Sequence, residues 1–328
     1  MKVFNSIRRT LAIGVCGLAV LSSTASAQED YPNKPISMIV PFPPGGVADT
    51  VGRPIAEAMT RILKQPIIVE NKAGAGGGVG MGQVAKAKAD GYTLLMALSS
   101  ITILPEADKV LNRSPLYQLN QFKAIARITA DPTVLVVRAD SPWKTFAEFM
   151  ADVKKAPGKY TFGSSGNYGT MHVPMEMLKS STNTFMVHVP YTGAGPALLG
   201  MLSNQVDALA TGPSSVVAQI KAGKVRALAH WGEDRLSALP DVPSLKELGH
   251  PIQFAQWAGL FVPAATPDAI VNKLREVAKQ AATDARVVQT INTAGSPILY
   301  LDKPEFEKYV ESESKLMSGV VKRIGKVE

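Results

Sequence analysis

Short apolar runs alternate with amphipathic segments through most of the chain. Residues 36–40, Ile-Ser-Met-Ile-Val, form a compact apolar run typical of a buried strand, and prolines and glycines end it at residues 43–46. Over residues 48–63 the apolar positions Val51, Ile55 and Met59 recur at helical spacing. This alternation predicts an α/β fold, with mostly parallel sheets.

The same alternation continues to the end of the chain, with interruptions at Asp131-Pro132 and at residue 254. Further strands are predicted at 67–70, 93–97, 133–137, 160–162, 185–189, 206–210, 225–230 and 254–262. Further helices are predicted at 80–89, 145–154, 171–179, 196–202, 215–222, 267–283 and 304–324.

The 328 residues exceed the size at which single cores usually stop growing, so two domains are expected. Two α/β series followed by two helices predict that the helices return to the first domain. We therefore place the crossings near residues 130 and 254. Domain 1 is then residues 28–130 plus 254–328, and domain 2 is residues 131–253.

The N-terminus has the parts of a secretory signal peptide. Lys2, Arg8 and Arg9 precede an apolar stretch over residues 11–21, and an Ala-Ser-Ala site follows at residues 25–27. The stretch is shorter than the roughly 20 residues that span a bilayer, which disfavours the alternative of an uncleaved anchor. We expect cleavage after Ala27 and a periplasmic location.

Composition removes several classes of chemistry. The single cysteine, Cys16, lies within the signal peptide, so the mature chain would have no disulfide, thiolate metal site or cysteine nucleophile. The four histidines show no metal-ligand spacing, and no metal or cofactor is expected. The net charge of +8 is spread evenly, without a basic run, which argues against nucleic acid as a partner.

The segment Pro41–Asp49 is the most informative candidate site because it joins a strand end to a helix start. Its glycines let a ligand approach the backbone, and the first N–H groups of the helix have no partners within it. With the helix dipole, these groups suit an anion. Asp49 has two interpretations, a helix-capping residue or a reader of ligand donors. The predicted ligand-binding residues here are Phe42, Gly45, Gly46, Val47, Ala48 and Asp49.

Other strand-to-helix turns repeat this arrangement. Hydroxyls follow the strand at 93–97, a glycine- and serine-rich turn follows the strand at 160–162, and an aromatic residue follows the strand at 185–189. The glycine-rich segment 74–80 lacks the dinucleotide spacing and is interpreted as a structural turn. His172 is interpreted first as a polar packing or cleft residue. The predicted ligand-binding residues in these turns are Ser99, Ser100, Ser164, Ser165, Gly166, Asn167, Thr170, His172 and Tyr191.

Motifs in nearly the whole mature chain resemble those of the tripartite tricarboxylate transporter receptors, the Bug-type solute-binding proteins. These motifs are Pro-Phe-Pro-Pro-Gly-Gly-x-x-Asp at 41–49, Glu-Asn-Lys-Ala-Gly-Ala-Gly-Gly at 70–77, Asp-Gly-Tyr-Thr-Leu at 90–94, Gly-Ser-Ser-Gly at 163–166 and Gln-Trp-Ala-Gly-Leu at 256–260. The resemblance implies a type II periplasmic-binding-protein-like fold, with two lobes and a ligand cleft between them. It also implies a permease partner with one large and one small subunit.

In such receptors the turn matching Gly45–Asp49 holds a carboxylate, and the turn matching Ser164–Thr170 holds the ligand from the other lobe. The chain departs from the family at Asn167-Tyr168, at Val173 and at residues 229–232. These positions leave the identity of the ligand open.

The resulting hypothesis is a monomeric periplasmic receptor, not an enzyme, for a small aliphatic or aromatic carboxylate, with dicarboxylates among the candidates. The alternative is an exported ligand sensor for a membrane two-component kinase, which the sequence does not separate from a transport receptor. A hydrolase is disfavoured, because no nucleophile–base pair is identifiable from the sequence.

Overall fold

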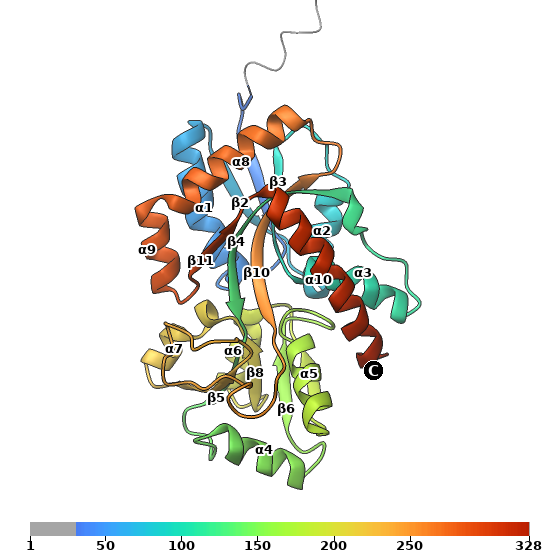
Figure 1. Ribbon diagram of the computed structural model, residues 1–328, viewed down its shortest axis with the longest axis vertical. Helices are drawn as coiled ribbons and strands as arrows, with labels where there is room; N and C mark the ends of the chain where they lie inside the picture. The colour runs from blue at the N-terminus through green and yellow to red at the C-terminus, as the bar shows by residue number, and fades with distance from the viewer. Residues whose placement is uncertain (1–30, 328) are drawn as a thin grey trace, which may run out of the picture. The chain divides into compact units, whose positions relative to one another are not determined.

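A computed structural model describes residues 31–327, in which two β-sheets are flanked by helices (Figure 1). The predicted signal peptide lies outside these residues. Within them, no helix is long and apolar enough to cross a membrane. The mixed α/β fold with two sheets is the predicted fold class.

The first sheet has six strands in the order β11-β4-β10-β3-β1-β2, and with its helices it forms what we call the first lobe. β1 is parallel to β2 and β3, whereas β10 is antiparallel to β3 and β4. The strands are β1 (Ile36–Val40), β2 (Ile67–Asn71), β3 (Thr93–Leu98), β4 (Phe122–Pro132), β10 (Ala255–Pro263) and β11 (Ile298–Leu301). The helices are α1 (Val47–Leu63), α2 (Gly78–Ala85), α3 (Ser100–Val110), α8 (Asp268–Thr283), α9 (Ala285–Thr293) and α10 (Lys303–Ile324), with short 3-10 turns η1 (Ala75–Gly77) and η2 (Leu119–Gln121).

The second sheet has five strands in the order β7-β6-β8-β5-β9, and with its helices it forms the second lobe. β6 is parallel to β7 and β8, whereas β5 is antiparallel to β8 and β9. The strands are β5 (Val134–Arg138), β6 (Thr161–Ser164), β7 (Val187–Pro190), β8 (Ala208–Thr211) and β9 (Val225–His230). The helices are α4 (Phe146–Lys155), α5 (Val173–Thr182), α6 (Ala194–Leu202) and α7 (Val217–Lys221), with a 3-10 turn η3 (Pro213–Ser215).

Both sheets are mixed, so the prediction of mostly parallel sheets was wrong. The antiparallel pairs all involve strands next to the passages between the sheets, β4, β5, β9 and β10, and the short edge strand β11. A chain that enters a sheet from the other lobe arrives from the opposite end, so it runs antiparallel to the strands already there. Apolar patterning identifies such a strand but not its direction.

Local sequence explains where several helices begin. Thr145 and Glu148 form a reciprocal capping box at the start of α4. Asp302 caps α10, and its carboxylate also pairs with Arg275 of α8 through bonds of 2.5 and 2.6 Å. The first lobe thus has α8 and α10 tied together at one end.

The two lobes are joined where β4 leads into β5 and where Trp231 leads towards β10. Thr133 and Trp231 bond to each other, and both bond to Phe254, at 2.9 to 3.2 Å. Asp131 is fully buried beside this crossing, and burial raises its pKa to about 7 against the hydrogen bonds that lower it. From Lys34 onward the chain forms one compact unit, so the domain boundaries near residues 130 and 254 stay a prediction.

Candidate ligand-binding site

The turn between β1 and α1 faces the second lobe. Val47 lies against Gly212, at the end of β8, and the Thr50 hydroxyl is 3.3 Å from the Ser214 hydroxyl in η3. At Gly193, an added methyl group would lie only 2.3 Å from Pro43 Cδ, so the two backbones approach closely at this point. The predicted carboxylate turn is therefore held against the other lobe.

Asp49 organises this turn from within. Its carboxylate accepts the Gly45 N–H at 3.0 Å and the Asn71 amide at 3.0 Å, and it pairs with Arg53 at 2.9 Å. Burial on its own would raise the pKa of Asp49, but the bonds from Arg53, Asn71 and Gly45 outweigh it and lower that pKa. Its oxygens are thus occupied within the turn, but Asp49 is not the N-cap of α1: that position is Gly46, and no side chain caps the helix.

Two N–H groups close the first turn of α1, those of Asp49 and Thr50, which both donate to the Gly46 carbonyl at 3.0 Å. The N–H groups of Val47 and Ala48 come earlier in the helix and have no acceptor within it. Val47, Ala48 and Phe42 are buried, and Val47 lies against Gly212 of the second lobe, while Gly45 is exposed. The helix dipole favours an anion here.

Five buried side chains with unpartnered polar atoms lie at or next to the ends of β3, β6, β8 and β10, and we call them the interlobe polar cluster. Three of them come from the first lobe and two from the second. β10 is antiparallel to β3, so its first residues lie beside the end of β3, and the Gln256 amide also approaches Gly212 of the second lobe. The members are Ser99, Ser100, Ser165, Thr211 and Gln256.

The cluster carries no ionic side chain. Ser99 and Ser100 stand at the N-terminus of α3, so a second helix dipole is directed to the same region as that of α1. Buried hydroxyls and amides without partners are costly, and such groups are normally satisfied by protein, water or ligand. This cluster suits a small polar molecule held by hydrogen bonds rather than by ion pairs.

Ser164 and Ser165 have different surroundings. The Ser164 hydroxyl accepts the Gly166 N–H at 3.1 Å and lies 2.6 Å from His188 Nε2, so it is used within its own lobe. The buried Ser165 hydroxyl has no partner and belongs to the cluster. Gly166 is half-buried with φ +121°, and it packs on the backbone of Gly76 in the first lobe, where a side chain would clash.

The Ser164–His188 contact is a hydroxyl beside an imidazole, which apolar and polar patterning did not reveal. Burial, with the neighbouring His172 adding to it, lowers the pKa of His188 to about 3. Such an imidazole is a poor base, and Ser164 is fully buried. The pair therefore ties β6 to β7 and fixes the turn.

His172 is fully buried and packs against the turn Ser164–Thr170. Its Nδ1 accepts the Tyr168 N–H at 2.9 Å, and its ring stacks on that of His188 at 4.0 Å. Its Nε2 lies 3.4 Å from a Glu176 oxygen, without hydrogen-bond geometry. His172 is thus packed inside the second lobe, with Thr170 buried beside it, and a role of either residue in ligand binding stays a prediction. In residues 31–327 no group of three or more His, Asp or Glu side chains is placed to hold a metal ion.

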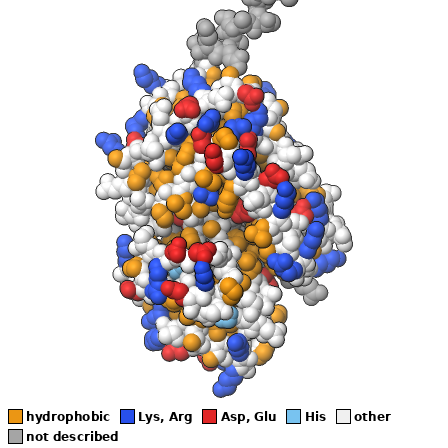
Figure 2. Space-filling model, in the orientation of Figure 1, with side chains coloured by type: hydrophobic (Ala, Val, Ile, Leu, Met, Phe, Trp, Pro, Cys, Tyr) orange, Lys and Arg blue, Asp and Glu red, His pale blue; other side chains and the backbone are white. Residues whose placement is uncertain are grey.

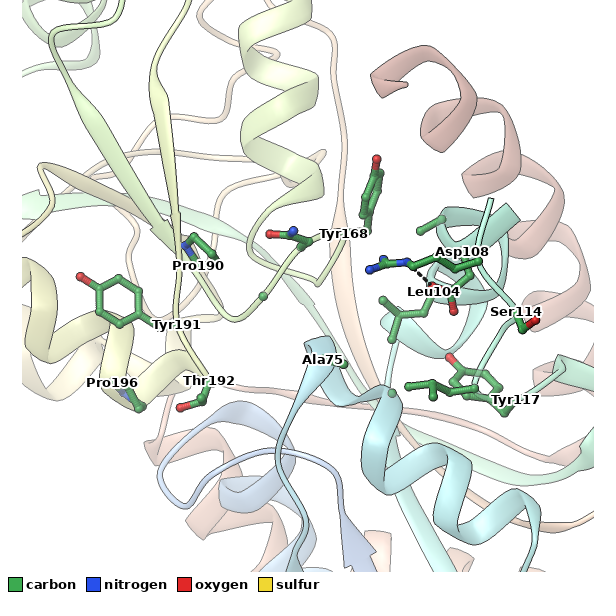
Figure 3. A pocket seen from close by; sticks show the side chains of 16 residues that line it. Ala75, Leu104, Asp108, Ser114, Tyr117, Tyr168, Pro190, Tyr191, Thr192 and Pro196 are labelled. Carbon is green, nitrogen blue, oxygen red and sulfur yellow. Dashed lines mark ion pairs between the residues drawn. The ribbon is translucent and has the colours of Figure 1, made fainter. Parts of the chain in front are cut away.

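A cavity of about 710 Å³ opens between the lobes, next to the turn Ser164–Thr170 (Figure 3). Its volume is in the range of small-molecule sites. Leu104, Tyr117 and the Arg113–Asp108 ion pair, at 3.4 Å, line it from the first lobe. Figure 2 shows that hydrophobic side chains gather where the two lobes meet on the face drawn there.

The cavity takes in only part of the predicted set. Gly166, Asn167 and Tyr191 line it, and the Tyr191 hydroxyl is directed to Gln205 at 3.3 Å. Phe42, the turn 45–49, Ser99 and Ser100 are not among its lining residues.

Two side chains of the interlobe polar cluster, Thr211 and Gln256, were not predicted from the sequence. Thr211 directly follows a predicted strand, which is the signal that selected Ser99.

Two mixed α/β lobes that meet through strand-to-helix turns define a two-lobed solute-binding protein. The model of the tripartite tricarboxylate transporter family receptor matches residues 51–326, and the chain belongs to that family. Among curated relatives, one protein of Bordetella pertussis is 33% identical, with 99% of each chain covered. The protein BugT of the same organism is 31% identical, with 98% of each chain covered.

Solved structures of similar proteins share the whole fold. The periplasmic binding protein BugD is 30% identical with a TM-score of 0.85, covering 90% of this chain and 99% of BugD. MatC from Rhodopseudomonas palustris, solved with bound malate, is 30% identical with a TM-score of 0.82, covering 89% and 100%. Rpa4515 of R. palustris, solved with adipate, is 25% identical with a TM-score of 0.84, covering 90% and 99%.

Proposed function

We propose that this protein is a periplasmic receptor that captures a small carboxylate for a tripartite uptake system. Its permease would have one large and one small membrane subunit. The export signal, with cleavage after Ala27, is part of this proposal. The malate and adipate bound by two similar proteins support a carboxylate, and a dicarboxylate in particular.

The interlobe polar cluster is the observation that carries the proposal. Its four hydroxyls and one amide are buried and unpartnered, come from both lobes, and stand at strand ends that include the N-terminus of α3, while the N-terminus of α1 follows the parallel neighbour of β3. A carboxylate placed there would accept hydrogen bonds from hydroxyls, the amide and helix N–H groups. These bonds would offset the cost of burying the charge. Because both lobes contribute, binding would hold them together.

The test is calorimetric titration of the mature protein with mono-, di- and tricarboxylates, aliphatic and aromatic, including malate and adipate. Removal of the Ser165 hydroxyl by Ser165→Ala should weaken the best ligand about 10- to 100-fold, as for a hydrogen bond to a charged group. The matched control is Ser141→Ala. Ser141 is also buried with an unpartnered hydroxyl, but it follows the end of β5 opposite to the crossing at Thr133. Absence of binding across the series, or equal losses in the two variants, would count against the proposal.

A further inference from the structure

The chain that follows α10 bonds to the turn Ser164–Thr170. α10 packs on α3 and β4 of the first lobe and also touches α5 of the second. At its end Gly325 adopts φ +69°, a conformation that turns the chain out of the helix. The Tyr168 hydroxyl donates to the Gly325 carbonyl at 2.5 Å and accepts the Val327 N–H at 3.1 Å. We call residues 325–327 the strap.

Tyr168 holds an unusual backbone conformation for this contact. Its φ is +56°, which is costly for a bulky side chain and persists only where the surroundings enforce it. Three contacts do so: the N–H bond to His172 Nδ1, the edge-on packing of the Tyr168 ring on His172 at 5.6 Å, and the bonds from the strap. Strain of this kind concentrates at functional sites.

The residues beside Tyr168 are those that face the first lobe. Ser165 belongs to the interlobe polar cluster, and Gly166 packs on Gly76. Asn167 and Tyr168 line the cavity between the lobes (Figure 3). Contacts that fix Tyr168 therefore also fix the part of the second lobe that would close over a ligand.

We infer that Tyr168 is a positioning residue for ligand capture, through which the strap holds the turn Ser164–Thr170 in its ligand-binding arrangement. The inference rests on the proposed function, and it adds that the contact between Tyr168 and the strap controls affinity. The strap bonds through backbone atoms of Gly325 and Val327, so its action depends on N–H and C=O groups and not on the side chains at 326 and 327.

Two variants remove the contact from opposite sides. Tyr168→Phe removes the hydroxyl but keeps the ring on His172, and Val327→Pro removes the N–H donor. Each should weaken binding of malate or adipate, whichever the wild type binds, about 3- to 10-fold. The double variant should lose no more than the stronger single variant, because both changes break one contact.

Matched controls separate this effect from a general loss of stability. Val327→Ala keeps the backbone N–H, and Tyr160→Phe removes a hydroxyl that contacts only Asp152 within the second lobe, at 3.5 Å. Both should bind like the wild type. Equal losses in the test and control variants, or additive losses in the double variant, would overturn the inference.

A second measurement needs no ligand. Amide hydrogen exchange at residues 165–172 should be faster in Tyr168→Phe and Val327→Pro than in the wild type, and unchanged in the two controls. Unchanged exchange in the test variants would overturn the inference, as would faster exchange with unaltered affinity. If the wild type binds no carboxylate, the proposed function fails, and exchange alone decides whether the strap holds the turn.

Discussion

Gly193 offers a direct test of how the lobes close. It lies at the start of α6 in the second lobe, and Pro43 faces it from the turn before α1. A methyl group at residue 193 would lie 2.3 Å from Pro43 Cδ and 2.6 Å from Pro43 Cγ. The φ of Gly193 is 170°, which is extended backbone that alanine adopts as well. The substitution Gly193→Ala therefore acts through the contact between the lobes.

The magnitude follows from the distances. Carbon atoms in contact prefer a separation of about 3.5 to 4.0 Å, so the two turns would have to separate by about 1 Å or more. The proline ring cannot rotate away. Overpacking of this kind costs about 1 to 3 kcal/mol, and here only the closed arrangement bears that cost. The affinity for a ligand that requires closure should fall about 5- to 150-fold.

The assay compares Gly193→Ala with Gly195→Ala, two residues away. A methyl group at 195 would lie 3.5 Å from the Pro44 carbonyl oxygen, which is an ordinary contact. Titration with malate and adipate should show the loss only in Gly193→Ala, while the ligand-free melting temperatures of both variants stay close to that of the wild type. Wild-type affinity in Gly193→Ala would show that the approach of Pro43 to Gly193 does not belong to the ligand-bound arrangement.

Two further predictions concern stability and pH. Arg275 lowers the pKa of Asp302 to about 2. After allowance for solvent screening, the ionised Asp302 therefore adds about 1 to 2 kcal/mol to the free energy of unfolding. This stabilisation is present above about pH 4 and is lost as the pH falls towards 2. Melting of Asp302→Asn between pH 6 and 2 should lack this loss, and parallel curves for variant and wild type would contradict it. Burial raises the pKa of Glu313, which accepts the Trp257 N–H, to about 8. Its stabilisation is complete below about pH 4.5 and is lost as the pH rises through 8. Glu313→Gln should therefore gain stability relative to the wild type between pH 5 and 9, and a constant difference in melting temperature would rule this out.

The sequence predicted most strands and helices because their apolar residues follow a regular period. β4 was missed because Lys123 and Arg127 interrupt its apolar pattern. Both side chains fold over neighbouring elements, since Lys123 pairs with Asp268 and the Arg127 guanidinium lies over the Tyr309 ring, 4.7 Å from its centroid. α3 was missed because Pro105 lies inside it. Tertiary contacts compensate for local signals that argue against both elements.

Tertiary contacts also limit how much of the candidate site can be predicted from the sequence. Turns at strand ends are local features, and from them the sequence predicts the turn at 45–49, Ser99 and Ser165 as ligand-binding residues. Gln256 enters the interlobe polar cluster through the antiparallel pairing of β10 with β3, about 160 residues away along the chain. The stacking of His172 on His188 likewise depends on the pairing of β6 with β7. Such pairings are set by the packing of the complete fold.

The position of β10 has a consequence for how the chain folds as it is made. All five strands of the second sheet lie within residues 134–230, so that sheet can complete itself as soon as this stretch is available. The first sheet cannot, because β10, residues 255–263, separates β3 from β4. Until it arrives, β3 and β4 keep open edges that invite pairing with other chains. The lobe whose synthesis starts first is thus completed last, and the nascent chain needs protection from aggregation throughout that interval.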